Sequence, residues 1–148
     1  MREIDLVQIF DIANKSNSHR LMRDTMLTLQ QNRDLGFVLL HSVAAFIDGL
    51  VAAPRGKVSE EYCKYLEAHF PDLCRSIEAK IFYENIRCTA IHEFALAPPL
   101  ALGHANAFQN PNEYSEPVTF DGADWLLVNV DLIASDFLEH LDHLDQLS

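Results

Sequence analysis

The chain has 148 residues, of which 49% are hydrophobic and 22% are charged, with 5 glycines and 6 prolines. This composition is typical of a soluble globular domain and excludes fibrous and intrinsically disordered proteins. The formal net charge of −11 excludes a broad basic surface for holding nucleic acid. We therefore expect a single domain over residues 1–148.

The charge is distributed unevenly along the chain. Residues 1–87 contain all 11 Lys and Arg side chains, whereas residues 88–148 contain 10 acidic side chains and no Lys or Arg. An anionic partner would have to contact the first half, and the second half suits a basic partner. A solvated helix face is the plain alternative for the best local basic patch, which consists of Lys15, Arg20, Arg23 and Arg33.

The cysteine pattern and the N-terminal sequence bear on the compartment. Cys63, Cys74 and Cys88 are odd in number and lack paired metal-ligand spacing, which favours reduced thiols. The segment MREIDLVQIF lacks the uninterrupted apolar run of a secretory signal. We therefore expect a cytoplasmic protein.

The first half of the chain is predicted to be helical. A short amphipathic segment precedes the polar break Asn14–Ser18, and a helical stretch then continues to about Ala53, with a bend near Arg33 and Asp34. The next helix begins at Ser59 as its N-cap and stops at Pro71.

One part of this stretch, Leu35–Ala53, is 19 residues long and mostly apolar, which is the length of a membrane span. It contains His41 and Asp48. A central acid costs about 2.5–3.5 kcal/mol on insertion into a bilayer. The segment is therefore predicted to be a buried helix, and no membrane association is expected.

The second half is predicted to contain two helices and a short hairpin. Asp72 caps a helix that continues to about Ala95, because apolar residues recur there at a spacing of three to five. Leu100–Phe108 and Pro117–Phe120 are predicted to pair as the hairpin.

Asn129 is the predicted N-cap of a strong terminal helix, which has a heptad-like apolar seam. These elements together predict a mostly α fold, a helical bundle of four to five helices with a small β-hairpin-like insertion.

A short motif lies within the helix predicted after Asp72. The segment Tyr83–Glu93 reads YENIRCTAIHE and places Arg87 five positions before His92. Here the sequence resembles the HEPN superfamily, whose hallmark is an Arg followed after four to six residues by a His. Asp48 in the preceding apolar helix and the terminal helix from Val130 support the likeness, which covers roughly residues 35–145.

The resemblance implies a small helical homodimer and, in catalytic members, a metal-independent endoribonuclease of toxin or stress-defence type, with a cognate antitoxin as a further partner. RNA cleavage by the 2′-hydroxyl needs a proton-transfer group and a cation near the phosphorane. His92 is the predicted acid/base and Arg87 the predicted phosphate clamp. No metal or cofactor is expected. The supporting residues are Glu84 and Asp48, and the predicted RNA contacts are Arg20, Arg23 and Arg33.

Two features of the motif leave a non-catalytic alternative open. On a straight α-helix Arg87 and His92 lie roughly 140° apart, so a shared site needs a curled Arg side chain or a two-fold axis. Cys88 also stands where active members commonly carry a polar residue. Arg87 would then pair with Glu84 or Asp48, and His92 would be part of the core. The protein would be a degenerate RNA binder or a non-enzymatic homodimeric interaction module with an acidic docking surface for a basic protein.

Two further groups of residues have a spacing that suits chemistry. His140, His143, Asp136 and Glu139 lie at the spacing at which ligands meet on a helix, and imidazole with carboxylate suits Zn²⁺ or Ni²⁺. Solvated acidic helix faces produce the same pattern. Cys88 lies one turn before His92, close enough for a thiolate and imidazolium pair, but a buried inert thiol is equally compatible with the sequence.

Overall fold

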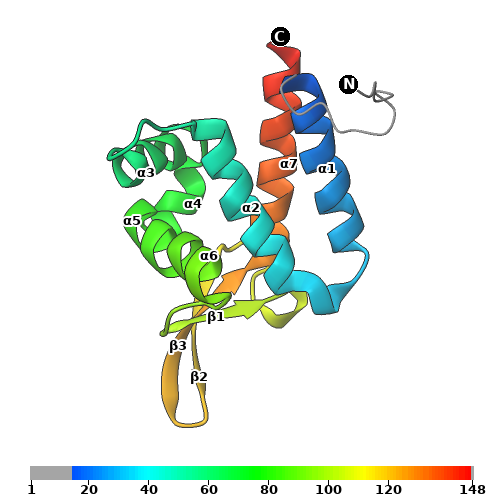
Figure 1. Ribbon diagram of the computed structural model, residues 1–148. Helices are drawn as coiled ribbons and strands as arrows, with labels where there is room; N and C mark the ends of the chain where they lie inside the picture. Colours follow the sequence, from blue (N-terminus) through cyan, green and yellow to red (C-terminus); the bar gives the residue numbers. More distant parts are fainter. Residues whose placement is uncertain (1–14, 148) are drawn as a thin grey trace, which may run out of the picture.

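The computed structural model describes residues 15–147, so the amphipathic segment expected before Asn14 lies outside the described residues (Figure 1). The helical stretch expected up to Ala53 is two helices, α1 (Lys15–Gln30) and α2 (Gly36–Val51), joined by the 3-10 turn η2 (Arg33–Leu35). The side chain of Asn32 accepts a hydrogen bond from the backbone N–H of Asp34 at 3.0 Å, which caps η2.

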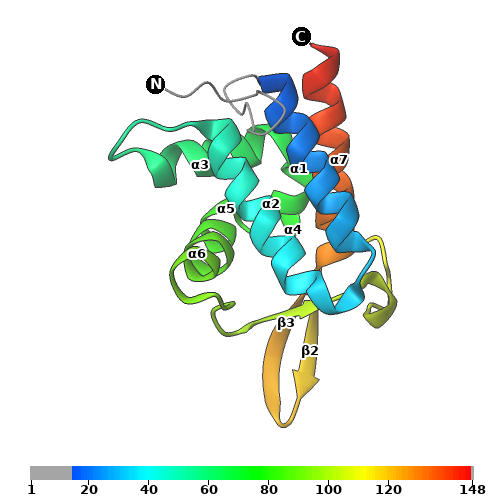
Figure 2. The same ribbon diagram turned by 45° about the vertical axis from the view of Figure 1, so that its right-hand side comes forward.

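The terminal helix α7 (Val130–Gln146) runs beside α1, and α2 packs against both of them (Figures 1 and 2). The predicted N-cap is confirmed, because the side chain of Asn129 accepts a hydrogen bond from the backbone N–H of Leu132 at 3.2 Å. The apolar faces of α2 and α7 meet in the core, to which they contribute Leu39, Leu40, Val43, Ala44, Ile47, Ile133, Ala134, Phe137 and Leu141.

A second group of helices packs on the other side of α2. It consists of α3 (Val58–His69), α4 (Pro71–Ser76), α5 (Ala79–Ile81), the π-helical segment η3 (Phe82–Cys88) and α6 (Thr89–Glu93). This group corrects two predictions about helix ends.

The N-cap of α3 is Lys57 and not Ser59, and Pro71 is the first residue of α4. Proline is favoured at that position because its missing N–H has no helical partner there. The single helix expected from Asp72 to Ala95 is also wrong, since the extended backbone of Ile77 interrupts it.

Three strands form a small mixed sheet below the helices, in the order β1-β3-β2 (Figure 1). Strand β1 (Leu100–Gly103) pairs in parallel with β3 (Ala123–Asn129), and β2 (Ser115–Phe120) pairs antiparallel with β3. The 3-10 turn η4 (Ala105–Ala107) follows β1.

The hairpin predicted between Leu100–Phe108 and Pro117–Phe120 is therefore wrong. The hairpin is β2–β3, and its turn is Asp121-Gly122, with φ values of +51° and +75°. Two positive φ values in a two-residue loop are the signature of a type I′ turn, whose twist matches that of the strands.

The predicted helical bundle is corrected to a helix-dominated mixed α/β fold, in which 66% of the described residues are helical. The difference comes from β3. Its apolar run Trp125–Val128 is short and lacks helical periodicity, and such runs do not distinguish a buried strand from a helix by pattern alone.

One helical stretch, Arg33–Val51, is long and apolar enough to cross a membrane by length and composition. A core helix of a folded domain passes the same test. Here α2 buries Leu39, Leu40 and Val43 in the core.

Candidate functional site

Arg87 is held by an ion pair with Asp48. Its Nε and Nη2 atoms each lie 2.7 Å from Oδ2 of Asp48, so η3 is tied to α2. The two side chains are only 16% and 23% exposed. Of the two partners that the sequence suggests for Arg87, Asp48 and Glu84, Asp48 is therefore the one that forms the ion pair. Glu84 points elsewhere, and its Oε1 lies 3.9 Å from Nζ of Lys80.

The remaining guanidinium nitrogen of Arg87 also faces protein groups. Nη1 lies 3.5 Å from the hydroxyl oxygen of Tyr83 and 3.7 Å from Sγ of Cys88, and the guanidinium carbon lies 5.1 Å from the Tyr83 ring centroid. Burial opposes the charge most strongly, but the hydrogen bonds to Asp48 and Cys88 and the nearby negative charge of Asp48 together outweigh it, so the pKa of Arg87 is raised. The guanidinium therefore stays charged and is directed into the protein.

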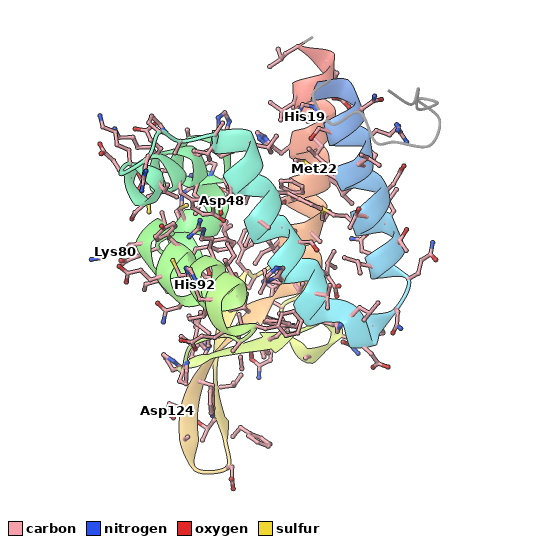
Figure 3. The ribbon with its side chains drawn as sticks, viewed as in Figure 1. His19, Met22, Asp48, Lys80, His92 and Asp124 are labelled. Atoms are coloured by element: carbon pink, nitrogen blue, oxygen red, sulfur yellow. The ribbon has the colours of Figure 1, made fainter. Side chains whose placement is uncertain are left out.

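His92 has a different environment. It lies on α6, and its side chain is exposed, which corrects the alternative that placed it in the core (Figure 3). Among the described residues, His92 makes no hydrogen bond or ion pair, so nothing there links it to Arg87 or Cys88. The structure therefore does not join the two motif residues within one copy of the chain.

An exposed apolar patch borders His92. Ile91 is 41% exposed and Phe94 is 64% exposed, and Phe94 ends α6 in the left-handed conformation with φ of +51°. The Phe94 ring packs edge-on against Phe37 of α2 at 4.8 Å between centroids, with His41 at 5.8 Å. We call Phe37, His41, Ile91 and Phe94 the aromatic patch. The i, i+4 spacing of Phe37 and His41 was its only sequence signal, and it was missed.

The predicted RNA-contacting arginines do not gather around His92. Nη2 of Arg23 lies 2.6 Å from Asp142 and 3.0 Å from Asp145, so Arg23 joins α1 to α7. Both views place α2 between α1 and α6 (Figures 1 and 2).

The other two arginines are also engaged. Arg20 lies 3.6 Å from Asp24, and Arg33 donates a hydrogen bond to the side chain of Asn106. The expected basic rim around the motif is therefore not formed by these three residues.

The cluster of His140, His143, Asp136 and Glu139, which the sequence offered only as an alternative to a solvated helix face, lines a cavity of about 230 Å³ between α7 and the start of α4. The Tyr65 hydroxyl and Nε2 of His140 are hydrogen-bonded at 2.6 Å. Burial lowers the pKa of His140 to about 4 and raises the pKa of Tyr65 to about 12, so both are neutral at pH 7. Tyr114 donates a hydrogen bond to Asp136, and burial raises the pKa of that carboxyl.

Within the described part of the chain, no group of three or more His, Cys, Asp or Glu side chains is placed to hold a metal ion. The alternative of a metal centre at His140, His143, Asp136 and Glu139 is therefore not supported by the arrangement of residues 15–147.

Among the described residues, basic side chains of the first half are mostly paired with carboxylates, whereas most acidic side chains of the second half have no basic partner. In the first half, six basic side chains lie within 4.0 Å of a carboxylate: Arg20, Arg23, Lys64, Arg75, Lys80 and Arg87. In the second half, the acids of residues 88–147 with no basic partner among the described residues are Glu93, Glu113, Glu116, Asp121, Asp124, Asp136 and Glu139. We call these acids the acidic surface.

Comparison with protein-family models, curated proteins and solved structures finds no match for the chain. The likeness to the HEPN superfamily therefore remains an expectation from the spacing of Arg87 and His92.

Proposed function

We propose that this protein is a homodimeric interaction module that binds a basic protein through its acidic surface. The observation that carries the proposal is the unequal pairing of charge. Six basic side chains of the first half lie within 4.0 Å of a carboxylate, whereas the seven acids of the acidic surface have no basic partner among the described residues. Unpaired charges of one sign steer an oppositely charged partner and repel a polyanion.

The environment of Arg87 supports a structural role for the motif. RNA phosphate would have to compete with Asp48, which already accepts a hydrogen bond from Nε of the guanidinium and lies 2.7 Å from its Nη2. Separating the pair would leave a mostly buried carboxylate without its partner, which is costly. The ion pair is therefore better suited to fixing η3 on α2 than to clamping a substrate.

The aromatic patch supports the homodimer. Ile91 and Phe94 expose apolar area at the end of α6, next to Phe37 of α2. Exposed apolar patches commonly mark protein contacts, and a two-fold axis buries the same patch on both copies. In this arrangement the acidic surface of the hairpin and α7 stays free for the partner.

The test is binding of a fluorescein-labelled octalysine peptide. Neutralising Glu113, Glu116 and Glu139 by Gln should weaken binding about tenfold, because each exposed ion pair contributes up to about 1 kcal/mol. The matched control, Asp34→Asn with Glu67→Gln and Glu78→Gln, removes the same charge from exposed sites in the first half. Equal weakening by the two variants, or no binding to the wild type, would contradict the proposal.

A second candidate is a metal-independent ribonuclease. The observation that favours it is the exposure of His92, whose imidazole is engaged by no described residue and lies beside the proposed dimer contact. An imidazole in this state is available for proton transfer. A composite site would need the partner copy to supply a cation, because Arg87 of the same copy is committed to Asp48.

A further inference from the structure

The sheet has one face in the core and one face that no helix or strand of residues 15–147 covers. Successive residues of a strand point to opposite faces. Leu100 and Val128 are buried in the core, so their neighbours Ala101 and Leu127, which are paired across β1 and β3, lie on the opposite face. Trp125 lies two residues before Leu127 and therefore on this same outer face, and its pairing partner across β2 is Val118.

The outer face contains an apolar hollow of about 390 Å³. Phe120 at the end of β2 is 73% exposed, and the β2–β3 hairpin projects away from the helices (Figures 1 and 2). The indole Nε1 of Trp125 is buried with no acceptor among the described residues. The residues that line the hollow are Ala101, Val118, Thr119, Phe120, Trp125 and Leu127.

The free edge of the sheet is poorly suited to adding a strand. Strand β2 is an edge strand in the order β1-β3-β2, and it contains Pro117, which has no backbone N–H to offer a new strand. A ligand would therefore lie on the apolar outer face instead of extending the hydrogen-bond ladder.

The charge around the hollow indicates which kind of ligand it attracts. Glu116 lies two residues before Val118 and therefore on the outer face, Asp121 lies in the hairpin turn, and residues 88–148 contain no Lys or Arg. A second copy of the chain would bring the same acids together and be repelled. A segment with basic side chains would be attracted, and aromatic residues such as Trp125 are typical anchors at protein contacts.

We infer that the outer face of the β1-β3-β2 sheet is the docking site for an extended basic segment of the partner protein. Alternate apolar side chains of the segment fill the hollow, and the intervening Lys or Arg side chains meet Glu116 and Asp121. This inference rests on the proposed function and assigns it a location and a partner chemistry.

Binding at the outer face can be followed by tryptophan fluorescence, because Trp125 is the sole tryptophan of the chain. The probe is an octapeptide of alternating Lys and Leu, compared with an octapeptide of alternating Lys and Ser that has the same charge. The Lys-Leu peptide should shift Trp125 emission to shorter wavelength and bind about tenfold more tightly, because its Leu side chains leave water.

Variants locate the binding site. Phe120→Ala should reduce Lys-Leu affinity to the Lys-Ser level, and its high exposure means that the fold loses little packing. Circular dichroism checks that the variant is folded. The control is Leu27→Ala, which shortens another exposed apolar side chain, on α1, and should leave Lys-Leu binding and the emission shift unchanged.

The outcomes separate this inference from the proposed function. If neither peptide binds, the proposed function fails. If both bind equally and Trp125 emission does not change, only the docking site is wrong. Retention of Lys-Leu affinity by Phe120→Ala would also overturn it, as would an emission shift that follows protein concentration alone, since a second copy would then occupy the face.

Discussion

Asp48 and Arg87 are 39 positions apart in the chain and form the ion pair that joins α2 to η3. The sequence offered Glu84 as an equal partner, because residues three apart share a face of an α-helix. The π-helical backbone of η3 changes which residues face each other, and Glu84 lies near Lys80. Propensity and pattern do not predict a π-helical segment, so this choice needed the structure.

Asp48→Ala should lower the free energy of unfolding by about 3 kcal/mol, because it leaves the mostly buried Arg87 guanidinium unpaired. The urea midpoint measures the loss. Asp24→Ala is the control, since its pair with Arg20 is about 60% exposed on both sides and contributes less than about 1 kcal/mol. An unchanged midpoint for Asp48→Ala would show that the pair does not hold the fold.

His140 should make the fold less stable at acid pH. The unfolded imidazole takes up a proton near pH 6.5, but burial keeps the folded pKa at about 4. Between these values the unfolded state binds more protons, so lowering the pH favours unfolding, by on the order of 2 kcal/mol. Urea unfolding at pH 7 and 4.5 should show this loss in the wild type and in His143→Gln, and a smaller loss in His140→Gln. Equal losses in all three proteins would reject the assignment.

The ribonuclease candidate depends on the imidazole of His92. If the wild type cleaves single-stranded RNA without metal, His92→Ala should reduce the rate at least about a hundredfold, because proton transfer commonly contributes that much. Helical content should be unchanged, since the side chain is exposed. The control is His143→Ala on α7, also exposed. Cleavage that persists in His92→Ala, or a wild type that leaves the RNA intact, eliminates this candidate.

At the scale of elements, the sequence indicated features that depend on a local pattern, but it did not indicate which distant segments pair. Asn129 was recognisable as an N-cap because a side-chain acceptor before an apolar seam is a local pattern. The turn Asp121-Gly122 was also a local signal for the β2–β3 hairpin, and it was overlooked. The parallel pairing of Leu100 with Leu126 joins distant segments, and no local pattern encodes it.

Gly122→Ala should destabilise the protein by about 1 kcal/mol, because φ of +75° in the hairpin turn is unfavourable for a residue with a Cβ atom. Gly49→Ala is the opposite case, since this glycine is inside α2 and a Cβ there meets only Met22 at an ordinary 3.7 Å. It should stabilise the helix by about 0.5–1 kcal/mol. Thermal unfolding compares the two, and a stabilising Gly122→Ala would contradict the type I′ turn.

At the scale of the whole molecule, the acidic balance was visible in the sequence, but the surface it forms was not. Arg23 and Asp142 are 119 positions apart, and only the packing of α1 on α7 pairs them. Such pairings engage six basic side chains of the first half, whereas the acids of the hairpin and of the middle of α7 have no basic partner among residues 15–147. Arg20, Arg23 and Arg33 therefore do not form one basic surface in the folded protein.

The homodimer should be sensitive to charge in the aromatic patch. Phe94→Asp places a carboxylate on a side chain that is 64% exposed, so the fold should be retained while two-fold packing is lost. Sedimentation velocity should show a dimer for the wild type and a monomer for the variant. Leu27→Asp is the control, because Leu27 is 46% exposed on α1, away from the patch. A wild-type monomer at micromolar concentrations would rule out the predicted assembly.

The central claim is that the molecule attracts basic partners and not RNA. Fluorescence anisotropy with two labelled probes, octalysine and a single-stranded RNA octamer, tests it at low and high salt. We predict that octalysine binds at low salt and is released at high salt, because screening weakens surface attraction, and that the RNA does not bind. Tight binding of the RNA, with no binding of octalysine, would contradict the account.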